Sequence, residues 1–290
     1  MKKYLLVLAL IFLSLSYVWG EDLIGLANSD WLEKHLKDPD IRIVDVRTSI
    51  NDYWSGHIPG AVYFNPEALR LSDHGIPGKL MPKEILALML GEMGIDNKTQ
   101  VVIYAENSDF KPTYLAWALE YLGHKKIKIL DGGFNKWESD KKPVTQDYPQ
   151  IVPKKYEVEK IDTQIRADLK EVKESLDKKD IIILDVRPPE VYKGEKGNWK
   201  RLGHIPKALN HYWELSITKE GMWKPKEELK KEYENKGITP DKKIIITCAQ
   251  GLMSAHTYFT LKHILGYPKV KNYDGSFNEW SSYPDLPVEK

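Results

Sequence analysis

The sequence contains a single cysteine, Cys248, and this scarcity excludes several kinds of site. One thiol cannot close an intrachain disulfide, and one cysteine with eight scattered histidines offers none of the ligand spacings of a zinc centre. Neither a phosphate-binding P-loop nor the glycine pattern of a dinucleotide-binding fold is present. The residues therefore imply no metal ion and no cofactor. The 43 basic and 42 acidic residues are interspersed, so the formal net charge of +1 gives no reason to expect a nucleic-acid partner.

Long apolar runs are also scarce, with one exception at the N-terminus. Residues 1–20 begin with Lys2 and Lys3, continue with an apolar run, and end on the small residues Val18 and Gly20. This pattern is typical of a secretory signal peptide, and the run is short for a membrane span of about 20 residues. An uncleaved membrane anchor is the alternative interpretation. We expect cleavage and export to the periplasm, with no stable membrane association of the mature protein.

The rest of the sequence contains an internal repeat. Four blocks of the first half recur in the same order in the second half, which indicates a duplicated unit of about 120 residues, an ordinary size for a domain. We predict an N-terminal domain over 21–146, a linker over 147–156 and a C-terminal domain over 157–290. The paired blocks are IRIVDVR (41–47) and IIILDVR (181–187), GHIPGA (56–61) and GHIPKA (203–208), 94–104 and 237–247, and 129–137 and 272–280.

Each repeat predicts an α/β domain. Short runs of β-branched residues with no polar alternation are typical of strands that are buried on both faces of a parallel sheet. Between them lie helical patterns at 82–94, 113–123, 225–237 and 255–266. We therefore predict two tandem domains, each a mainly parallel sheet with helices on both faces. Ligands of such sheets bind beyond the carboxyl ends of the strands, where Cys248 is placed.

The surroundings of Cys248 favour a reactive thiol. The residue follows the strand pattern at 244–247, Gly251 allows a tight turn, and a helix is expected to begin near Met253 or Ser254. Consecutive backbone N–H groups in such a loop can form an anion-binding nest that the positive end of the helix reinforces. A thiolate or a persulfide would be stabilised there. The alternative is an inert small residue at the end of a strand.

The first repeat argues against the inert alternative. Ala105, followed by Glu106 and Asn107, occupies the position that corresponds to Cys248. The strand is kept in the first half, whereas the thiol is not. We therefore expect chemistry in the second half and a structural role for the first.

Two kinds of polar residue recur in both halves. Arg187 ends a strand and can lean toward the Cys248 loop, where a guanidinium would bind an oxyanion or a carboxylate in bidentate fashion. Arg47 has the same place in the half without a cysteine, so a structural brace is an equally good interpretation. Asp45 and Asp185 are expected to anchor the strand ends.

The histidines are expected to have structural roles. His57 and His204 lie in the GHIP blocks of both halves, so we expect them to hold a turn. His256 is expected on the flank of the helix after the loop, not facing the thiol.

Taken together, the LDVR strand, the GHIP turn, the cysteine loop and the YDGSFNEW ending resemble the two-domain rhodanese sulfurtransferases. That family includes thiosulfate and 3-mercaptopyruvate sulfurtransferases. The resemblance implies that Cys248 takes sulfane sulfur from a donor, becomes a persulfide, and passes the sulfur to an acceptor such as cyanide or a thiol. Cys248 is then the catalytic residue. The implied substrate-binding residues are Arg187, Ala249, Gln250, Gly251, Leu252, Met253 and Ser254.

The loop departs from the family pattern because it carries neither a basic residue nor a threonine hydroxyl. The donor is therefore open, and Arg187, Arg201 or Lys200 are expected to supply positive charge. The alternative function is a sulfur carrier or sensor that binds sulfur on Cys248 for a partner protein, with little turnover of small molecules. A phosphatase of the related type is excluded, because Ser254 stands where an arginine is required.

Overall fold

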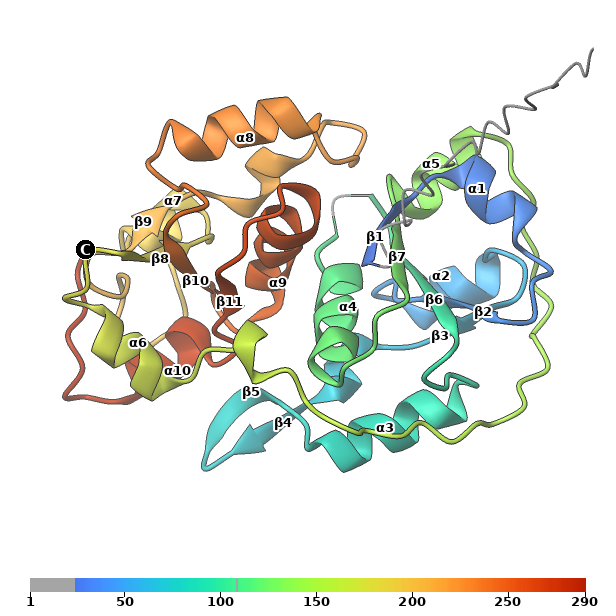
Figure 1. Ribbon diagram of the computed structural model, residues 1–290, viewed down its shortest axis with the longest axis horizontal. Coiled ribbons are helices and arrows are strands. Elements are labelled where there is room, and N and C mark those ends of the chain that lie inside the picture. Colours follow the sequence, from blue (N-terminus) through green and yellow to red (C-terminus); the bar gives the residue numbers. More distant parts are fainter. Residues whose placement is uncertain (1–23, 108) are drawn as a thin grey trace, which may run out of the picture.

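The computed structural model describes residues 24–107 and 109–290, so the expected signal peptide lies outside the described residues. Each half contains one parallel sheet (Figure 1). The first sheet has the order β1-β7-β6-β2-β3 and the second has the order β11-β10-β8-β9. The strands are β1 (Ile24–Ala27), β2 (Ile41–Asp45), β3 (Ala61–Tyr63), β6 (Gln100–Tyr104), β7 (Ile127–Leu130), β8 (Ile181–Asp185), β9 (Leu209–Asn210), β10 (Lys243–Thr247) and β11 (Val270–Asn272).

The two sheets have the same topology, as the repeat predicts. Strands β7, β6, β2 and β3 correspond in sequence and in sheet order to β11, β10, β8 and β9. In the second sheet a single parallel bridge between Arg166 and Asn272 takes the place of β1. The central strands are buried on both faces; Ile244, Ile245 and Ile246 of β10 are all 0% exposed. The predicted fold class is confirmed.

Helices cover both faces of the sheets. Helices α3 and α8 begin directly after Pro82 and Pro225, where the missing proline N–H is not needed. The helices are α1 (Ser29–Lys34), α2 (Ile50–Ser55), α3 (Lys83–Glu92), α4 (Lys111–Tyr121), α5 (Gly133–Ser139), α6 (Leu169–Ser175), α7 (Pro189–Tyr192), α8 (Lys226–Glu234), α9 (Leu252–Phe259) and α10 (Ser276–Ser282). The short turns are η1 (Pro66–Leu69), η2 (Thr163–Ile165), η3 (Trp213–Ser216) and the π-helical η4 (Thr260–Ile264).

The two halves pack on each other through α4 and α9, which lie side by side at the centre of the molecule (Figure 1). Both helices are buried nearly all round, and Trp117 and Phe259 belong to one continuous core. At the edge of this contact the His263 ring lies 2.9 Å from the Glu120 carboxylate. The buried residues of the two helices include polar ones, among them Thr113 of α4 and His256 and Thr257 of α9, because each helix is covered by its own sheet and by the other half.

A β-hairpin of the first half reaches across to the second half. Strands β4 (Arg70–Asp73) and β5 (Ile76–Leu80) are antiparallel, and we call them the 70–80 hairpin. Figure 1 shows it extending below the second half toward α10. The contacts across the boundary include an ion pair of 2.7 Å between Lys79 and Glu279, and hydrogen bonds from Asn278 to the Pro77 carbonyl and from the Leu80 N–H to Asp274.

A segment of the second half also contacts the first half. Its segment 217–223, closed by a bridge between Ile217 and Trp223, reaches the first half, where the Trp223 N–H donates to Asp131 at 3.0 Å. Asp131 and Asp274 occupy corresponding positions in the ILDGGF and NYDGSF blocks. Each half therefore covers the carboxyl strand ends of the other.

The connection between the halves contains no helix or strand between α5 and η2. The predicted linker over 147–156 falls within this stretch; the exact domain bounds stay a prediction. Among residues 24–107 and 109–290, no helix combines the length and the apolar character that crossing a bilayer demands.

Candidate active site

Cys248 lies directly beyond the carboxyl end of β10, and two hydrogen-bond donors converge on its sulfur. The Gly251 N–H is 3.1 Å from Sγ and the Ser254 hydroxyl 3.4 Å, while the Ser276 hydroxyl oxygen lies 3.9 Å away. The side chain is only 1% exposed. The thiol is thus buried with two donors aimed at its sulfur, an arrangement that can stabilise negative charge on sulfur.

The loop is shaped by where its carbonyl groups are held. Four successive carbonyl oxygens, those of residues 248–251, accept hydrogen bonds from the surrounding scaffold. Because each carbonyl is drawn outward, the opposite side of the peptide chain is free to turn its N–H groups inward. The donors are Phe277 N to Cys248 O, Asn278 N to Ala249 O, Arg70 Nη2 to Gln250 O, and Asn272 Nδ2 to Gly251 O.

Glycine is required at position 251. The residue has φ +89°, in the left-handed region that residues with a Cβ rarely adopt. A Cβ there would lie 2.7 Å from both Cα and O of Asp274. Gly251 caps the start of α9, which begins at Leu252, slightly earlier than the predicted Met253 or Ser254.

Ser276 is a site residue that the sequence analysis missed. Its hydroxyl accepts from the Cys248 N–H at 3.1 Å and lies 2.6 Å from the Tyr273 carbonyl. Its φ is +51°, whereas Gly133 takes the same conformation at the corresponding place in the first half. A serine held there costs about 1 kcal/mol or more of backbone strain. The sequence feature that could have identified Ser276 is the serine at this position, because the first half has a glycine there.

The cation at the Cys248 loop comes from the other half of the molecule. Arg70, at the start of the 70–80 hairpin, donates from Nη2 to the Gln250 carbonyl at 3.1 Å and to Gln250 Oε1 at 3.0 Å. Its Nη1 donates to Glu67 at 2.8 Å, and its side chain is 6% exposed. Arg70 and Gln250 line an open hollow of about 350 Å³ beside the loop.

The predicted sources of charge lie elsewhere. Arg201 donates to the carbonyls of Tyr283 and Leu286, and Lys200 is exposed on the surface. Neither is hydrogen-bonded to the loop in the part of the chain that the structure describes. The contacts of Arg201 thus tie down the C-terminal segment, and a supply of positive charge by the insertion stays a prediction.

Arg187 makes the contacts of a brace. Its Nη2 lies 2.5 Å from Asp185 Oδ2 and donates to the Gly203 carbonyl at 2.8 Å, and the guanidinium stacks over the Phe277 ring. The first half repeats this arrangement without a thiol. There Arg47 pairs with Asp45 and bonds to the Gly56 carbonyl.

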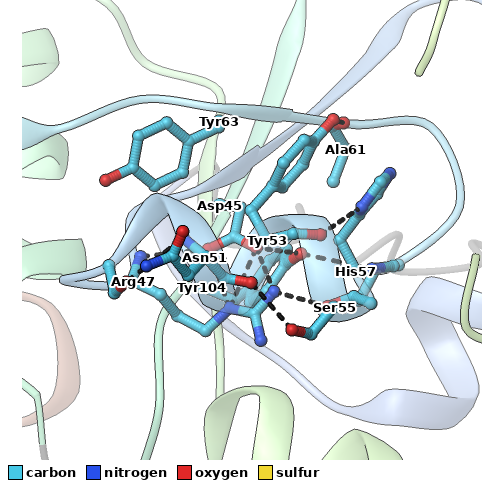
Figure 2. Close-up of polar contacts among 12 residues, drawn as sticks. Asp45, Arg47, Asn51, Tyr53, Ser55, His57, Ala61, Tyr63 and Tyr104 are labelled. Atoms are coloured by element: carbon cyan, nitrogen blue, oxygen red, sulfur yellow. Dashed lines mark hydrogen bonds and ion pairs between the residues drawn. The ribbon is translucent and has the colours of Figure 1, made fainter. Parts of the chain in front are cut away.

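Figure 2 shows the first-half version of the brace, in which the Tyr104 hydroxyl also donates to Asp45 at 2.7 Å. Burial and the neighbouring Asp45 carboxylate raise the pKa of Tyr104, so this hydroxyl stays protonated. The repeated geometry favours the brace for Arg187. One of its nitrogens, Nη1, has no hydrogen-bond partner among the described residues, and substrate binding by this residue stays a prediction.

The histidines hold structure, as expected. The rings of His57 and His204 stack on Tyr53 and Tyr192 and hydrogen-bond to the carbonyls of those tyrosines. His256 stacks on Trp223 at 4.8 Å. Burial lowers the pKa of His256 to about 3, so its ring is neutral. This histidine is part of the packing and is not a base for the thiol.

The corresponding place in the first half is filled. Around Ala105 the remaining hollow is only about 20 Å³, and Trp223 and His256 of the second half line it. Aromatic rings thus occupy the strand ends that lack the thiol, whereas polar groups cover the ends that carry it. In residues 24–107 and 109–290, no group of three or more His, Cys, Asp or Glu side chains is placed to hold a metal ion.

Comparisons with known proteins agree with this geometry. A rhodanese-like domain matches residues 28–140 and again 168–283. The sulfur carrier protein TtuD of Thermus thermophilus is 36% identical over 276 residues, which cover 91% of this chain and 96% of that protein. A "Putative thiosulfate sulfurtransferase" of Synechococcus elongatus is 36% identical over 269 residues, which cover 89% of this chain and 83% of that protein.

Among solved structures, a variant of EanB in complex with ergothioneine covalently linked with a persulfide cysteine is similar in fold. It has a TM-score of 0.80 and 25% identity, and the match covers 91% of this chain and 70% of that one. The domain matches span most of the chain and place one copy in each half. This protein therefore belongs to the rhodanese-like family and carries two tandem rhodanese-like domains.

Proposed function

We propose that this protein is a sulfurtransferase that works through a persulfide on Cys248. The supporting observation is the convergence of the Gly251 N–H and the Ser254 hydroxyl on Sγ. These donors would stabilise negative charge on the thiolate and on the persulfide that replaces it.

The reaction has two displacement steps. The Cys248 thiolate attacks the outer sulfur of the donor, a new S–S bond forms, and the donor's own bond to that sulfur breaks. With thiosulfate the leaving group is sulfite, which takes the electron pair. An acceptor such as cyanide or a thiolate then attacks the outer persulfide sulfur, forms its bond to sulfur and releases the Cys248 thiolate.

Thiosulfate and 3-mercaptopyruvate are the proposed donors. Several relatives of 34–36% identity are named for thiosulfate. Arg70 beside the loop gives an anionic donor a cation to approach, although the loop itself is neutral.

Delivery of the sulfur to a protein is the second candidate function. It is favoured by the relative named as a sulfur carrier, which matches over nearly its whole length. In this case the persulfide would form on Cys248 as before, and a protein acceptor would replace cyanide or a small thiol.

Turnover measurements separate the two candidates. The protein is mixed with thiosulfate and cyanide, and separately with mercaptopyruvate and a thiol, and thiocyanate or pyruvate is measured. The enzyme produces one of them, and Cys248→Ser abolishes that activity while the melting temperature is retained. Activity in the serine variant would refute the assignment. A persulfide on Cys248 without turnover of either donor would identify a carrier.

We also propose that the protein is exported, which rests on the pattern of residues 1–20. Expression of the full chain in a Gram-negative host, followed by the intact mass of the periplasmic fraction, tests this. A mature protein that begins after Gly20 is expected. A full-length protein that is recovered from the membrane fraction would identify an anchor.

A further inference from the structure

We infer that Arg70 is a positioning residue that acts on the Cys248 sulfur through a single peptide group, so that the first half of the molecule controls the reactivity of the second. The inference rests on the proposed function and deepens it. It assigns a role to a side chain that lies outside the predicted site and comes from the domain without a thiol.

The geometry is a chain of two hydrogen bonds through one peptide. Arg70 Nη2 donates to the carbonyl oxygen of Gln250 at 3.1 Å. The N–H of that same peptide, which belongs to Gly251, donates to Cys248 Sγ at 3.1 Å. The guanidinium and the sulfur are therefore the two ends of one polarised amide.

Such an amide transmits charge in a definite direction. A cation at the carbonyl oxygen draws electrons from the amide nitrogen, and the N–H becomes a stronger donor. The sulfur gains most from a strong donor when it is an anion, as a thiolate or as a persulfide. Arg70 thus favours the charged form of the sulfur without touching it.

The protein holds Arg70 firmly in this position. The side chain is only 6% exposed. Its Nε donates to the Gly78 carbonyl, and its Nη1 pairs with Glu67. Gln250 Oε1 gives Nη2 a second acceptor, which keeps the guanidinium over the peptide. The peptide cannot rotate easily on its other side, since Asn272 Nδ2 holds the carbonyl of Gly251.

The first half lacks this arrangement. Ile217, which follows η3 as Arg70 follows η1, occupies the corresponding place in the second repeat and lines the small hollow at Ala105. The asymmetry follows the thiol: a cation faces the loop with the cysteine, and an apolar side chain faces the end with the alanine.

The sequence offers a direct probe, since Gln250–Gly251 is the only Gln-Gly step in the chain. Protein labelled with ¹³C at glutamine carbonyls and ¹⁵N at glycine gives one carbonyl–nitrogen correlation, which reports on this peptide alone. We expect the signal to move when a donor converts Cys248 to the persulfide, and to move again in Arg70→Lys. A signal that stays fixed in both would overturn the inference.

Kinetics supply the second readout. In Arg70→Gln the ultraviolet thiolate absorbance of the unloaded protein falls, and the rate of persulfide formation at saturating donor falls about tenfold, the effect of losing a charge-assisted contact. Arg70→Lys, which keeps the charge, recovers part of the rate. Unchanged absorbance and rate in a folded Arg70→Gln variant would contradict the inference.

A control distinguishes the relay from loosening of the hairpin. Asn278→Ala removes only a bond from α10 to Pro77 of the hairpin and leaves the charge unchanged. It should leave the thiolate absorbance and the Gln–Gly signal as in the wild type. An equal effect in this variant would assign the Arg70 result to hairpin packing. If wild-type protein forms no persulfide with any donor, the proposed function fails, while the absorbance of unloaded Arg70→Gln still decides the role of Arg70.

Discussion

For single residues, the chemistry expected of Cys248 depends on which atoms face its sulfur. The two donors, from Gly251 and Ser254, belong to the loop that the sequence singled out, and Ser276, which accepts from the Cys248 N–H, comes from the turn after the neighbouring strand. Parallel strands bring their carboxyl ends to one edge, so residues far apart in sequence meet there. The half that carries the thiol therefore differs from the other half in a few side chains, while the two halves share the same sheet topology.

Ser276→Gly should reduce sulfur transfer without unfolding the protein. Glycine restores the residue that the first half has at this place and relieves the strain of φ +51°. It removes a hydroxyl near Sγ and the acceptor of the Cys248 N–H. We expect the free energy of unfolding to change by less than about 1 kcal/mol, because strain relief and lost hydrogen bonds oppose each other. The rate of persulfide formation should fall severalfold; an unchanged rate would remove Ser276 from the site.

At the scale of elements, the Cys248 loop and the paired braces are rigid parts. The loop is held by four outward carbonyl bonds, and in each half the end of one strand, β2 or β8, is held by a buried Arg–Asp pair. A loop with so many fixed groups needs no reorganisation when charge develops on its sulfur. Its position depends on close packing against Asp274, which the next prediction tests.

Gly251→Ala should damage both stability and activity. Left-handed backbone costs an alanine about 1–2 kcal/mol, and the Cβ additionally meets Asp274 at 2.7 Å. Gly237→Ala is the matched control, since φ there is +75° and a Cβ meets nothing within 4 Å. We expect urea unfolding to show a larger loss at 251 than at 237, and persulfide formation to fail only in the first variant. Equal losses with full activity would contradict the described loop.

Arg187→Ala and Arg47→Ala compare the two braces. Each removes one partner of a buried ion pair and leaves Asp185 or Asp45 uncompensated, which costs about 3–5 kcal/mol. If both arginines are braces, the two variants lose similar stability, and the Michaelis constant for thiosulfate stays near the wild-type value in whatever remains folded. A constant raised only in Arg187→Ala would establish the predicted role in donor binding.

In the whole molecule, a segment of each half covers the carboxyl strand ends of the other half. The 70–80 hairpin lies over the second sheet's strand ends, and segment 217–223 lies over those of the first. The 70–80 hairpin places Arg70 against the Cys248 loop, and segment 217–223 places Trp223 at the corresponding position of the first half. The half without the thiol is thus part of the site.

Much of this architecture was predictable from the sequence, and one part was not. The repeat, the apolar strands and the Pro and Gly at helix ends predict the two sheets and the place of Cys248, because these are local patterns. Arg70 lies 180 positions from Gln250. Nothing local in "ALRLSD" indicates that this hairpin crosses to the other half, since that depends on how α4 packs on α9.

Acid should destabilise the folded protein through two buried histidines. Burial lowers the pKa of His256 to about 3, and burial with nearby lysines lowers that of His211 to about 4. Both rings take up protons more readily when unfolded, near pH 6.5, so their contribution is complete above that pH and is lost as the pH falls toward the folded values.

The expected slope is about 1.4 kcal/mol per pH unit for each histidine below pH 6.5. Urea unfolding at a series of pH values measures this slope of the free energy of unfolding. His256→Phe should remove the contribution of one histidine to it. A slope that is the same in this variant would show that His256 is not neutral in the folded protein.

The central claim is that Cys248 accepts a sulfur atom, and a mass spectrum tests it most directly. The mature protein is exposed to thiosulfate, freed of the donor, digested under non-reducing conditions and compared with Cys248→Ser. The account predicts an addition of about 32 Da, one sulfur atom, confined to the peptide that contains Cys248, and its loss when cyanide is added. A Cys248 peptide of unchanged mass after exposure to both thiosulfate and mercaptopyruvate would contradict it.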